Sequence, residues 1–125
     1  MSRTILLASA LKPQAAARAA ADAPEPIDLV ITSPSAVARE AAAIAVGGRW
    51  VFTVDEPLLA TRAAAESGAD VIARLARALR LACAFDARAP LVVCDGLDIL
   101  GAGVFKIDEA GVERFADDLE RLLPS

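Results

Sequence analysis

The stretch from Ile27 to Ala42, IDLVITSPSAVAREAA, constrains the fold more than any other part of the sequence. It begins with the apolar residues Ile27, Leu29, Val30 and Ile31, a run typical of a parallel strand covered on both faces. Ser33 and Pro34 then suit the start of a helix. The hydroxyl of Ser33 can cap free amides, and Pro34 fits the first helical position. A strand, a tight turn and a helix therefore follow one another. This order places Ser33 at the carboxyl edge of a sheet, where open α/β folds bind ligands.

The alternation of strand and helix continues along the whole chain. Short apolar runs predict further strands at 4–10, 50–54, 90–94 and 103–107. Helical spacing of apolar residues predicts helices at 14–22, 34–46 and 67–84, and a last helix capped by Asp108. This order predicts an α/β fold, a three-layer α/β/α sandwich with a mostly parallel sheet, in a single domain over residues 1–125.

Two of the predicted helices carry specific expectations about burial. The helix at 34–46 has only Arg39 and Glu40 as strongly polar residues beyond its first turn, so we expect it to be largely covered. In the helix at 67–84, Leu75 and Leu79 are expected to face inward, while Arg74 and Arg77 face water.

The composition fits closely packed helices and gives no sign of a membrane segment. Apolar residues make up 56% of the chain and the mean hydropathy is +0.48, but aromatic residues make up only 4%, so alanine supplies much of the excess. Alanine-rich helices pack closely on a sheet. No apolar run approaches the roughly 20 residues of a membrane span, and the first residues do not resemble a secretion signal. We therefore expect a cytoplasmic protein that does not enter the membrane.

Charge and residue usage exclude several function classes. The net charge of −4, without a basic cluster, argues against nucleic-acid binding, which requires Lys and Arg to neutralise phosphates. The chain contains no histidine, so the commonest general base and metal ligand is missing. Cys83 and Cys94 are too far apart for a CxxC pair and too few for a zinc site, and we expect both in the core.

Three short patterns in the C-terminal third of the chain do not support a cofactor or metal site. The segment 96–103 has the glycine spacing of a phosphate-binding loop, but Ala102 and Gly103 stand where a lysine and a hydroxyl residue are needed. Lys106 replaces the third glycine of a dinucleotide-binding pattern. Asp95 and Asp98 lie on one turn, an arrangement more typical of a cap and a solvated side chain than of a metal site. We expect no cofactor and no metal.

Several segments resemble, in their order and strand context, the histidine phosphatase superfamily, which contains phosphoglycerate mutase and small phosphohistidine phosphatases. The most specific segment, DLVITSPSAVAREAA at 28–42, is similar to that family's strand ending in Ser-Pro before an Arg-Ala-containing helix. The other similar segments are TILLASA at 4–10, Glu66-Ser67 followed by Val71 and Arg74, and PLVVCDG at 90–96. The resemblance covers residues 3 to about 100 and implies a phosphoglycerate mutase-like sandwich. A response-regulator receiver domain fits less well, because no acidic pair follows the first strand.

The residues that the resemblance would assign to chemistry are replaced. Ala8, Ser9 and Ala10 stand where the family has an arginine, the nucleophilic histidine and a glycine. Val37 stands at the position of a second arginine, and the proton-donating acid falls near Ala60. Asp95 replaces the second histidine. The pocket positions Ala8, Ser9, Val37 and Asp95 are therefore degenerate, and no catalytic residue is expected.

These replacements predict a pseudoenzyme. Phosphoryl transfer depends on cations that match the charge of the transferring group, and neither Ala8 nor Val37 supplies one. The resemblance therefore implies a catalytically inactive histidine-phosphatase-like domain that acts as a binding or assembly module. The apolar helix at 34–46 and the high hydropathy predict self-association, as a homodimer, or binding to a protein partner.

An alternative hypothesis gives the same sheet edge a new use. Ser9, Ser33, Cys94 and Asp95 are expected to converge there, which would allow a small-molecule-binding protein or an atypical hydrolase with a pocket around Ser9, Ser33 and Asp95. A serine or cysteine nucleophile needs a base, and an aspartate bonded directly to serine is a feeble one at neutral pH. We favour the simpler interpretation that Ser9 satisfies backbone amides, Cys94 lies in the core and Asp95 caps the helix that follows it.

Overall fold

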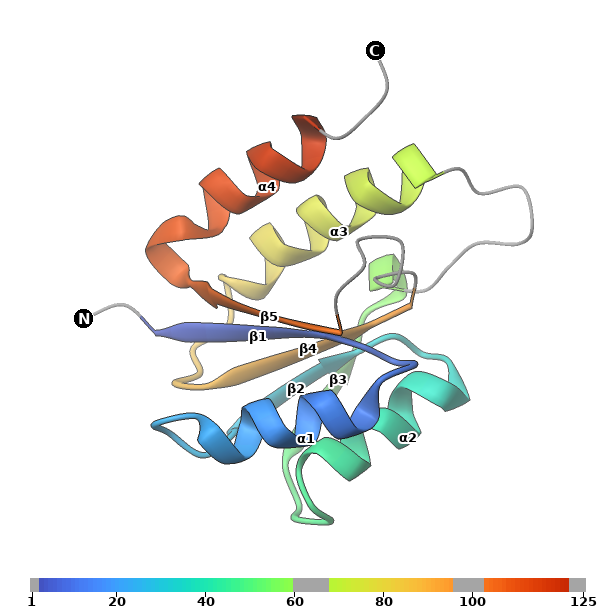
Figure 1. Cartoon of the computed structure of the whole chain (residues 1–125), viewed down its shortest axis with the longest axis vertical. Helices are drawn as coiled ribbons and strands as arrows, with labels where there is room; N and C mark the ends of the chain where they lie inside the picture. Colours follow the sequence, from blue (N-terminus) through green and yellow to red (C-terminus); the bar gives the residue numbers. More distant parts are fainter. Residues whose placement is uncertain (1–2, 60–67, 96–102, 122–125) are drawn as a thin grey trace.

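A five-stranded sheet with the strand order β3-β2-β4-β1-β5 forms the centre of the molecule (Figure 1). The computed structural model describes residues 3–59, 68–95 and 103–121. The strands are β1 (Thr4–Ser9), β2 (Leu29–Thr32), β3 (Phe52–Asp55), β4 (Pro90–Cys94) and β5 (Val104–Asp108). Strands β1 to β4 run parallel, and β5 runs antiparallel to β1. The predicted α/β class and the mostly parallel sheet are confirmed.

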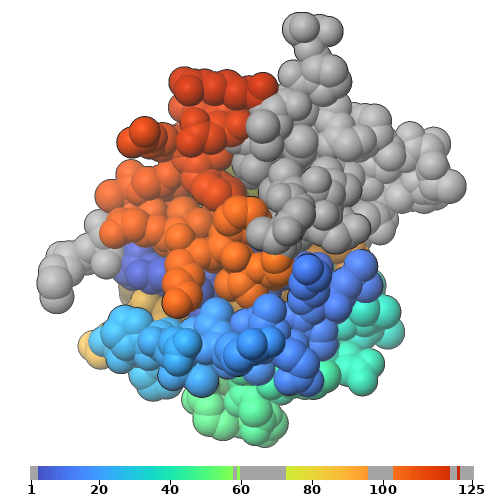
Figure 2. Space-filling model, in the orientation of Figure 1, coloured from blue at the N-terminus to red at the C-terminus, as the bar shows by residue number. Residues whose placement is uncertain are grey.

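Helices cover both faces of the sheet. The helices are α1 (Pro13–Asp22), α2 (Ala36–Ala45), α3 (Gly68–Ala82) and α4 (Val112–Arg121). Figure 1 shows α1 and α2 together on one face, and α3 and α4 together on the other. In Figure 2, α1 (blue) and α4 (red) lie on opposite sides of β5 (orange). Two short 3₁₀ helices, η1 (Pro57–Leu59) and η3 (Glu109–Gly111), complete the described elements. Within the described residues, no helix combines the length and the apolar character needed to cross a bilayer.

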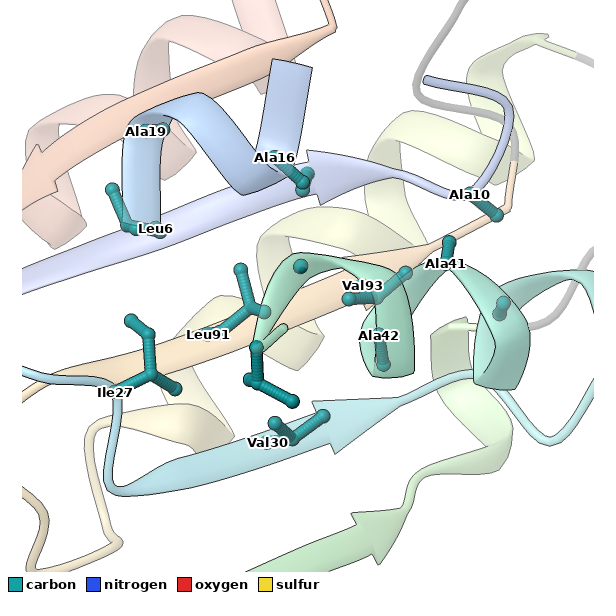
Figure 3. Packing of buried hydrophobic residues seen from close by; sticks show 14 of the residues in the cluster. Leu6, Ala10, Ala16, Ala19, Ile27, Val30, Ala41, Ala42, Leu91 and Val93 are labelled. Atoms are coloured by element: carbon teal, nitrogen blue, oxygen red, sulfur yellow. The ribbon is translucent and has the colours of Figure 1, made fainter. Parts of the chain in front are cut away.

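Each face of the sheet has its own core, because successive side chains of a strand point to opposite faces. On β1, Ile5 and Leu7 pack under α3 and α4, whereas Leu6 and Ala8 pack under α1 and α2. The core under α1 and α2 is rich in alanine, and Figure 3 shows alanines of both helices facing branched residues of the strands. The small side chains let these helices lie close to the sheet, as the composition predicted.

Helix α2 differs from the prediction in its start and in its burial. The helix begins at Ala36 and is capped by Ser35, whose Oγ accepts a hydrogen bond from the backbone N–H of Ala38 at 3.1 Å. Ser33 is therefore not the cap, because its Oγ accepts from the backbone N–H of Ser35, which precedes the helix. The expectation that this helix is largely covered is wrong. Only four alanines, at positions 38, 41, 42 and 45, are buried along α2, and they form the stripe that faces the sheet.

Arg74 on α3 also differs from the prediction. It was expected to face water, but only 7% of its surface is exposed. Helix α3 contacts both α4 and η1 as well as the core beneath it. Its buried arc is therefore wider than the single stripe that the spacing of Leu75 and Leu79 predicts. Arg77, by contrast, is exposed as expected.

Candidate functional site

The predicted candidate site lies where three parallel strands end side by side. Ser9 ends β1 and is the register partner of Cys94, which ends β4. Ser33 follows β2, and its backbone N–H donates to the carbonyl of Val93 at 2.9 Å. Asp95 follows β4 directly. The carboxyl ends of parallel strands share one edge of a sheet, so the fold brings these polar residues together as the sequence predicted.

The carboxylate of Asp95 is bound to two serines at the start of α2. The Oγ of Ser33 donates to Oδ2 of Asp95 at 2.8 Å, and the Oγ of Ser35 donates to Oδ1 at 3.2 Å. Each serine hydroxyl has a single proton to donate, and both protons are directed to this carboxylate. The backbone N–H of Asp95 donates to the carbonyl of Leu59, which fixes the position of the turn. Asp95 therefore links the end of β4 to the N-terminus of α2.

The two serines also serve the backbone of the turn that leads into α2. Ser33 Oγ accepts a hydrogen bond from the backbone N–H of Ser35 at 3.3 Å, and Ser35 Oγ caps the helix. The sequence Ser33-Pro34-Ser35 thus supplies one hydroxyl to the turn and one to the cap. Because the positive end of the helix dipole lies here, a carboxylate at this place is favourable. Asp95 occupies the kind of position that a bound anion takes at other helix N-termini.

Ser33 is poorly placed to act as a nucleophile. Its surface is completely buried, and its hydroxyl is held between Asp95 and the backbone of Ser35. A catalytic serine needs its oxygen within reach of the substrate and a base that is free to take its proton. In this arrangement the hydroxyl has a structural role.

Ser9 does not join the hydrogen-bond cluster of Ser33, Ser35 and Asp95. It is 1% exposed, and its Oγ accepts a hydrogen bond from the backbone N–H of Leu11 at 3.2 Å. Ser9 therefore stabilises the turn after β1, which confirms that it satisfies a backbone amide at the strand end. Ser9 therefore lies at the same sheet edge as Ser33 and Asp95, as expected, but its hydroxyl bonds to the backbone of Leu11 rather than to them.

Ala8 and Val37, the two positions at which the resemblance expects arginines, do not form a phosphate site. Ala8 is fully buried in the core under α1 and α2. Val37 is on the solvent side of α2, with 53% of its surface exposed. Arg39 lies two residues further along α2 and forms an ion pair with Asp55 at the end of β3. Among the described residues, the guanidinium of Arg39 is directed to Asp55, whereas the carboxylate of Asp95 is bound by Ser33 and Ser35.

The two cysteines do not form a reactive site. Cys94 is fully buried in the core, and its Sγ lies 3.6 Å from the carbonyl oxygen of Ala8. Cys83, at the end of α3, is only partly buried. Burial and the nearby carboxylate of Glu109 raise the pKa of the Cys83 thiol, which keeps it in the less nucleophilic protonated form.

Some expectations fall on residues outside the described parts of the chain. They are the acid position at Ala60, the Glu66-Ser67 segment, Arg62, the glycine-rich segment 96–102 and Asp98. The helix that Asp95 was expected to cap would also fall there, whereas the carboxylate oxygens of Asp95 are directed to the start of α2. Among the residues that the structure describes, no three His, Cys, Asp or Glu side chains gather as a metal ion would require.

Ser35 is the residue of this cluster that the sequence analysis missed. The signal was present, because Ser33 and Ser35 flank Pro34 at the end of a buried strand and both can cap a helix. What the sequence did not show is that β4 lies next to β2, which brings Asp95 to both hydroxyls. Comparison with protein families, with curated proteins and with solved structures finds no match for this chain.

Proposed function

We propose that this chain is a histidine-phosphatase-like domain that has lost phosphoryl-transfer chemistry and acts as a binding or assembly module. The proposal includes the phosphoglycerate mutase-like form of the sandwich, for which the parallel strands and the helices on both faces give support. Its cytoplasmic location is an expectation from the sequence. The observation that carries the proposal is the position of the Asp95 carboxylate.

Asp95 opposes phosphate binding in two ways. Its carboxylate takes the hydroxyl donors of Ser33 and Ser35, which a phosphate at the start of α2 would otherwise use. It also brings a negative charge to that place. Repulsion between two unit charges about 4 Å apart is worth roughly 4 kcal/mol at an effective dielectric of 20. This corresponds to a loss of about three orders of magnitude in affinity, as an upper bound for a partly hydrated site.

Among the described residues, Asp95 forms no ion pair that would offset this charge. Ala8 and Val37 carry no charge, and Arg39 is paired with Asp55. Phosphoryl transfer depends on positioned cations and on a nucleophile, and the loss of a covalent nucleophile alone costs a factor of about 10⁴ to 10⁶. A site that binds phosphate poorly and lacks a nucleophile supports a role in binding rather than in catalysis.

The test combines an activity assay with a binding assay on the full chain. Hydrolysis of p-nitrophenyl phosphate is measured with and without Mg²⁺, and phosphate binding is measured as a shift of the melting temperature. The variants are Asp95→Asn, which removes the charge, and Asp86→Asn, which removes an exposed charge from another loop as a control.

The wild type and the Asp86→Asn variant are expected to show neither hydrolysis nor saturable stabilisation by phosphate. Asp95→Asn is expected to gain weak phosphate binding because the repulsion is removed, still without hydrolysis. Turnover of the substrate by the wild-type protein, proportional to protein concentration, would overturn the proposal.

A further inference from the structure

Strand β3 is an open edge of the sheet with an apolar surface. It lies at one end of the strand order and pairs with β2, and no other strand in the described residues covers its outer side. Trp50 and Phe52 are 86% and 58% exposed, the first just before the strand and the second at its start. Figure 2 shows the green atoms of this part of the chain projecting below α1. An exposed apolar edge strand is a ready template for pairing with another strand.

The backbone groups that face outward on β3 can be identified from its bonds to β2. The backbone N–H of Glu56 donates to the carbonyl of Thr32 at 2.8 Å, so Glu56 faces β2. Residues two apart along a strand face the same way, so Phe52 also directs its N–H and C=O to β2. Val51, Thr53 and Asp55 therefore direct theirs away from the sheet. The hydroxyl of Thr53 donates to the carbonyl of Val51 at 3.0 Å, which satisfies one of these outward groups locally.

The features that usually protect an edge strand are sparse on β3. Natural proteins place lysine, proline or a bulge on such edges. The strand Phe52–Asp55 has one charged residue, at its last position, and Pro57 follows only after the strand has ended. The two glycines with positive φ, Gly47 and Gly48, form the turn before the strand, where they permit the tight reversal out of α2. Within the described residues, no lysine, proline or bulge lies on the strand Phe52–Asp55 itself.

We propose that β3 pairs antiparallel with β3 of a second copy of this chain, around a twofold axis at Phe52, so that one sheet continues through both copies. This pairing rests on the proposed assembly role and gives that role a surface. Two copies related by a twofold axis present the same strand to each other, which closes the assembly at a dimer.

The register follows from the direction of the backbone groups. In an antiparallel pair, residues that face the partner exchange both hydrogen bonds, and the residues between them form close side-chain pairs without bonds. With the axis at Phe52, the outward-facing Val51 of each copy lies opposite the outward-facing Thr53 of the other. Phe52, which faces β2, forms the central close pair with its own counterpart. Trp50 then lies opposite Val54 on the same face, so the exposed aromatic side chains and Val54 form one apolar stripe.

Charge complementarity selects a second copy as the partner. In the same register Arg49 of each copy lies opposite Asp55 of the other, on the face where Asp55 already pairs with Arg39. The sequence RWVFTVD at 49–55 is therefore complementary to its own reverse, with opposite charges at the ends and apolar or β-branched residues between them. Opposite charges and aromatic or β-branched residues are favourable cross-strand pairs.

The size of the contact predicts a weak dimer. Buried Trp and Phe side chains cover about 150–250 Å² each. Two rings from each copy bury about 600–1,000 Å² in total, so with the short strands the contact lies near the lower limit of about 1,200 Å² for stable interfaces. We therefore expect an equilibrium between monomer and dimer that depends on concentration, with dissociation at about micromolar or higher concentrations.

The first experiment measures the molar mass of the full chain by sedimentation velocity over increasing concentration. Thr53→Pro removes an outward N–H that β2 does not use, and Phe52→Lys places a charge at the axis. Leu81→Lys, on an exposed apolar residue of α3, is the matched control. The wild type and Leu81→Lys are expected to dimerise alike, and both β3 variants are expected to stay monomeric, with circular dichroism confirming that each is folded.

The second experiment exchanges the end charges. Arg49→Asp and Asp55→Arg each place like charges opposite each other in the homodimer, so each variant alone is expected to associate at least tenfold more weakly than the wild type. Mixed together, the two variants restore both opposite-charge pairs and are expected to form a heterodimer. This readout does not depend on any variant that removes a backbone hydrogen bond.

The third experiment tests the register by disulfide formation, with Cys83 replaced by serine. Phe52→Cys places two thiols at the central pair, where the Cα atoms of a non-hydrogen-bonded pair lie about 4.5 Å apart, within disulfide range. Thr53→Cys is the control, because its opposite residue is Val51. Rapid oxidation to a covalent dimer is expected only for Phe52→Cys.

A wild-type chain that stays monomeric at the highest concentration would overturn the pairing. A dimer that persists in both Thr53→Pro and Phe52→Lys would overturn it as well. These failures are distinguishable from failure of the proposed function. A monomer without phosphatase activity leaves the loss of phosphoryl chemistry standing, and a dimer that hydrolyses phosphomonoesters contradicts that loss but not the pairing.

Discussion

Removal of the Asp95 carboxylate tests whether this residue holds the end of β4 to the start of α2. In Asp95→Ala, the hydroxyl of Ser33 loses its acceptor at 2.8 Å while remaining in a fully buried place. Ser35 loses its acceptor at 3.2 Å, but it is only partly buried and can donate to water. The main cost therefore comes from Ser33.

The magnitude follows from the chemistry of the lost bonds. A buried donor without a partner costs about 1–3 kcal/mol, and hydrogen bonds to charged groups are at the upper end of this range. We expect Asp95→Ala to lower the free energy of unfolding by about 2–3 kcal/mol, which for a domain of this size lowers the melting temperature by about 8–12 °C. Asp95→Asn keeps one acceptor oxygen and is expected to lose about half as much.

A double-mutant cycle separates this bond from other effects of the substitution. Urea unfolding is measured for the wild type, Asp95→Ala, Ser33→Ala and the double variant, with Asp86→Ala as the control for loss of an exposed carboxylate. In the Asp95→Ala background, Ser33→Ala removes the buried hydroxyl that has lost its acceptor. This second substitution is expected to leave the free energy of unfolding unchanged or to raise it. The coupling energy is expected to be about 1–2 kcal/mol. Additive effects, with a coupling below about 0.5 kcal/mol, would refute the reasoning.

Two further predictions concern side chains that brace the backbone. Burial raises the pKa of the Asp28 carboxyl, but hydrogen bonds from the backbone N–H groups of Arg88 and Ala89, at 2.8 and 2.9 Å, outweigh it and leave the pKa lowered. The stabilisation by Asp28 is therefore complete above the unfolded pKa of about 3.9 and is lost as the pH falls through the lower folded value. Asp28→Asn should lower the free energy of unfolding in urea by about 1 kcal/mol at pH 7 and by progressively less below pH 4. An equal loss at pH 7 and at a pH below 4 would contradict this. The guanidinium of Arg3 donates to three backbone carbonyls beyond α3 and pairs with Glu109. Because lysine cannot make all of these bonds, Arg3→Lys should lower the free energy of unfolding by about 2 kcal/mol. An unchanged midpoint of urea unfolding would count against this role.

The sequence predicted the elements well where their signal is local. The strand Pro90–Cys94 has the predicted bounds, and on α1 the polar residues Gln14, Arg18 and Asp22, spaced four apart, are exposed. Asp108 caps the turn that leads into α4 through a 2.9 Å bond from the backbone N–H of Ala110. Each of these features depends on residues close together in the chain, which explains why spacing and capping residues were sufficient.

Features that depend on long-range packing were predicted less well. The apolar composition of α2 suggested a covered helix, but α2 packs only one stripe of alanines on the sheet and leaves residues such as Val37 and Ile44 in water. The aromatic strand was expected at 50–54, and the structure starts it at Phe52, on an edge of the sheet. Aromatic residues indicate a strand, but the order of strands decides whether they are buried.

The candidate site shows the same division. The sequence placed Ser33 and Asp95 at strand ends on the same edge of the sheet, and the structure confirms that they meet. It did not identify Ser35 as the cap of α2 and the second partner of Asp95. That role depends on the distance between two segments sixty residues apart in the chain, which is set by the pairing of β2 with β4.

The most direct test of the central claim is a titration of the ¹⁵N-labelled chain with inorganic phosphate, followed by NMR of the backbone amides. The amides of Ser35 and Ala38 at the start of α2 report on an anion bound there. Because the Asp95 carboxylate already occupies this place, we predict no saturable change in these signals up to about millimolar phosphate, a concentration that would reveal binding worth about 4 kcal/mol. Saturable shifts confined to these amides in the wild-type protein would contradict the claim that the chain has replaced its phosphate site with its own carboxylate.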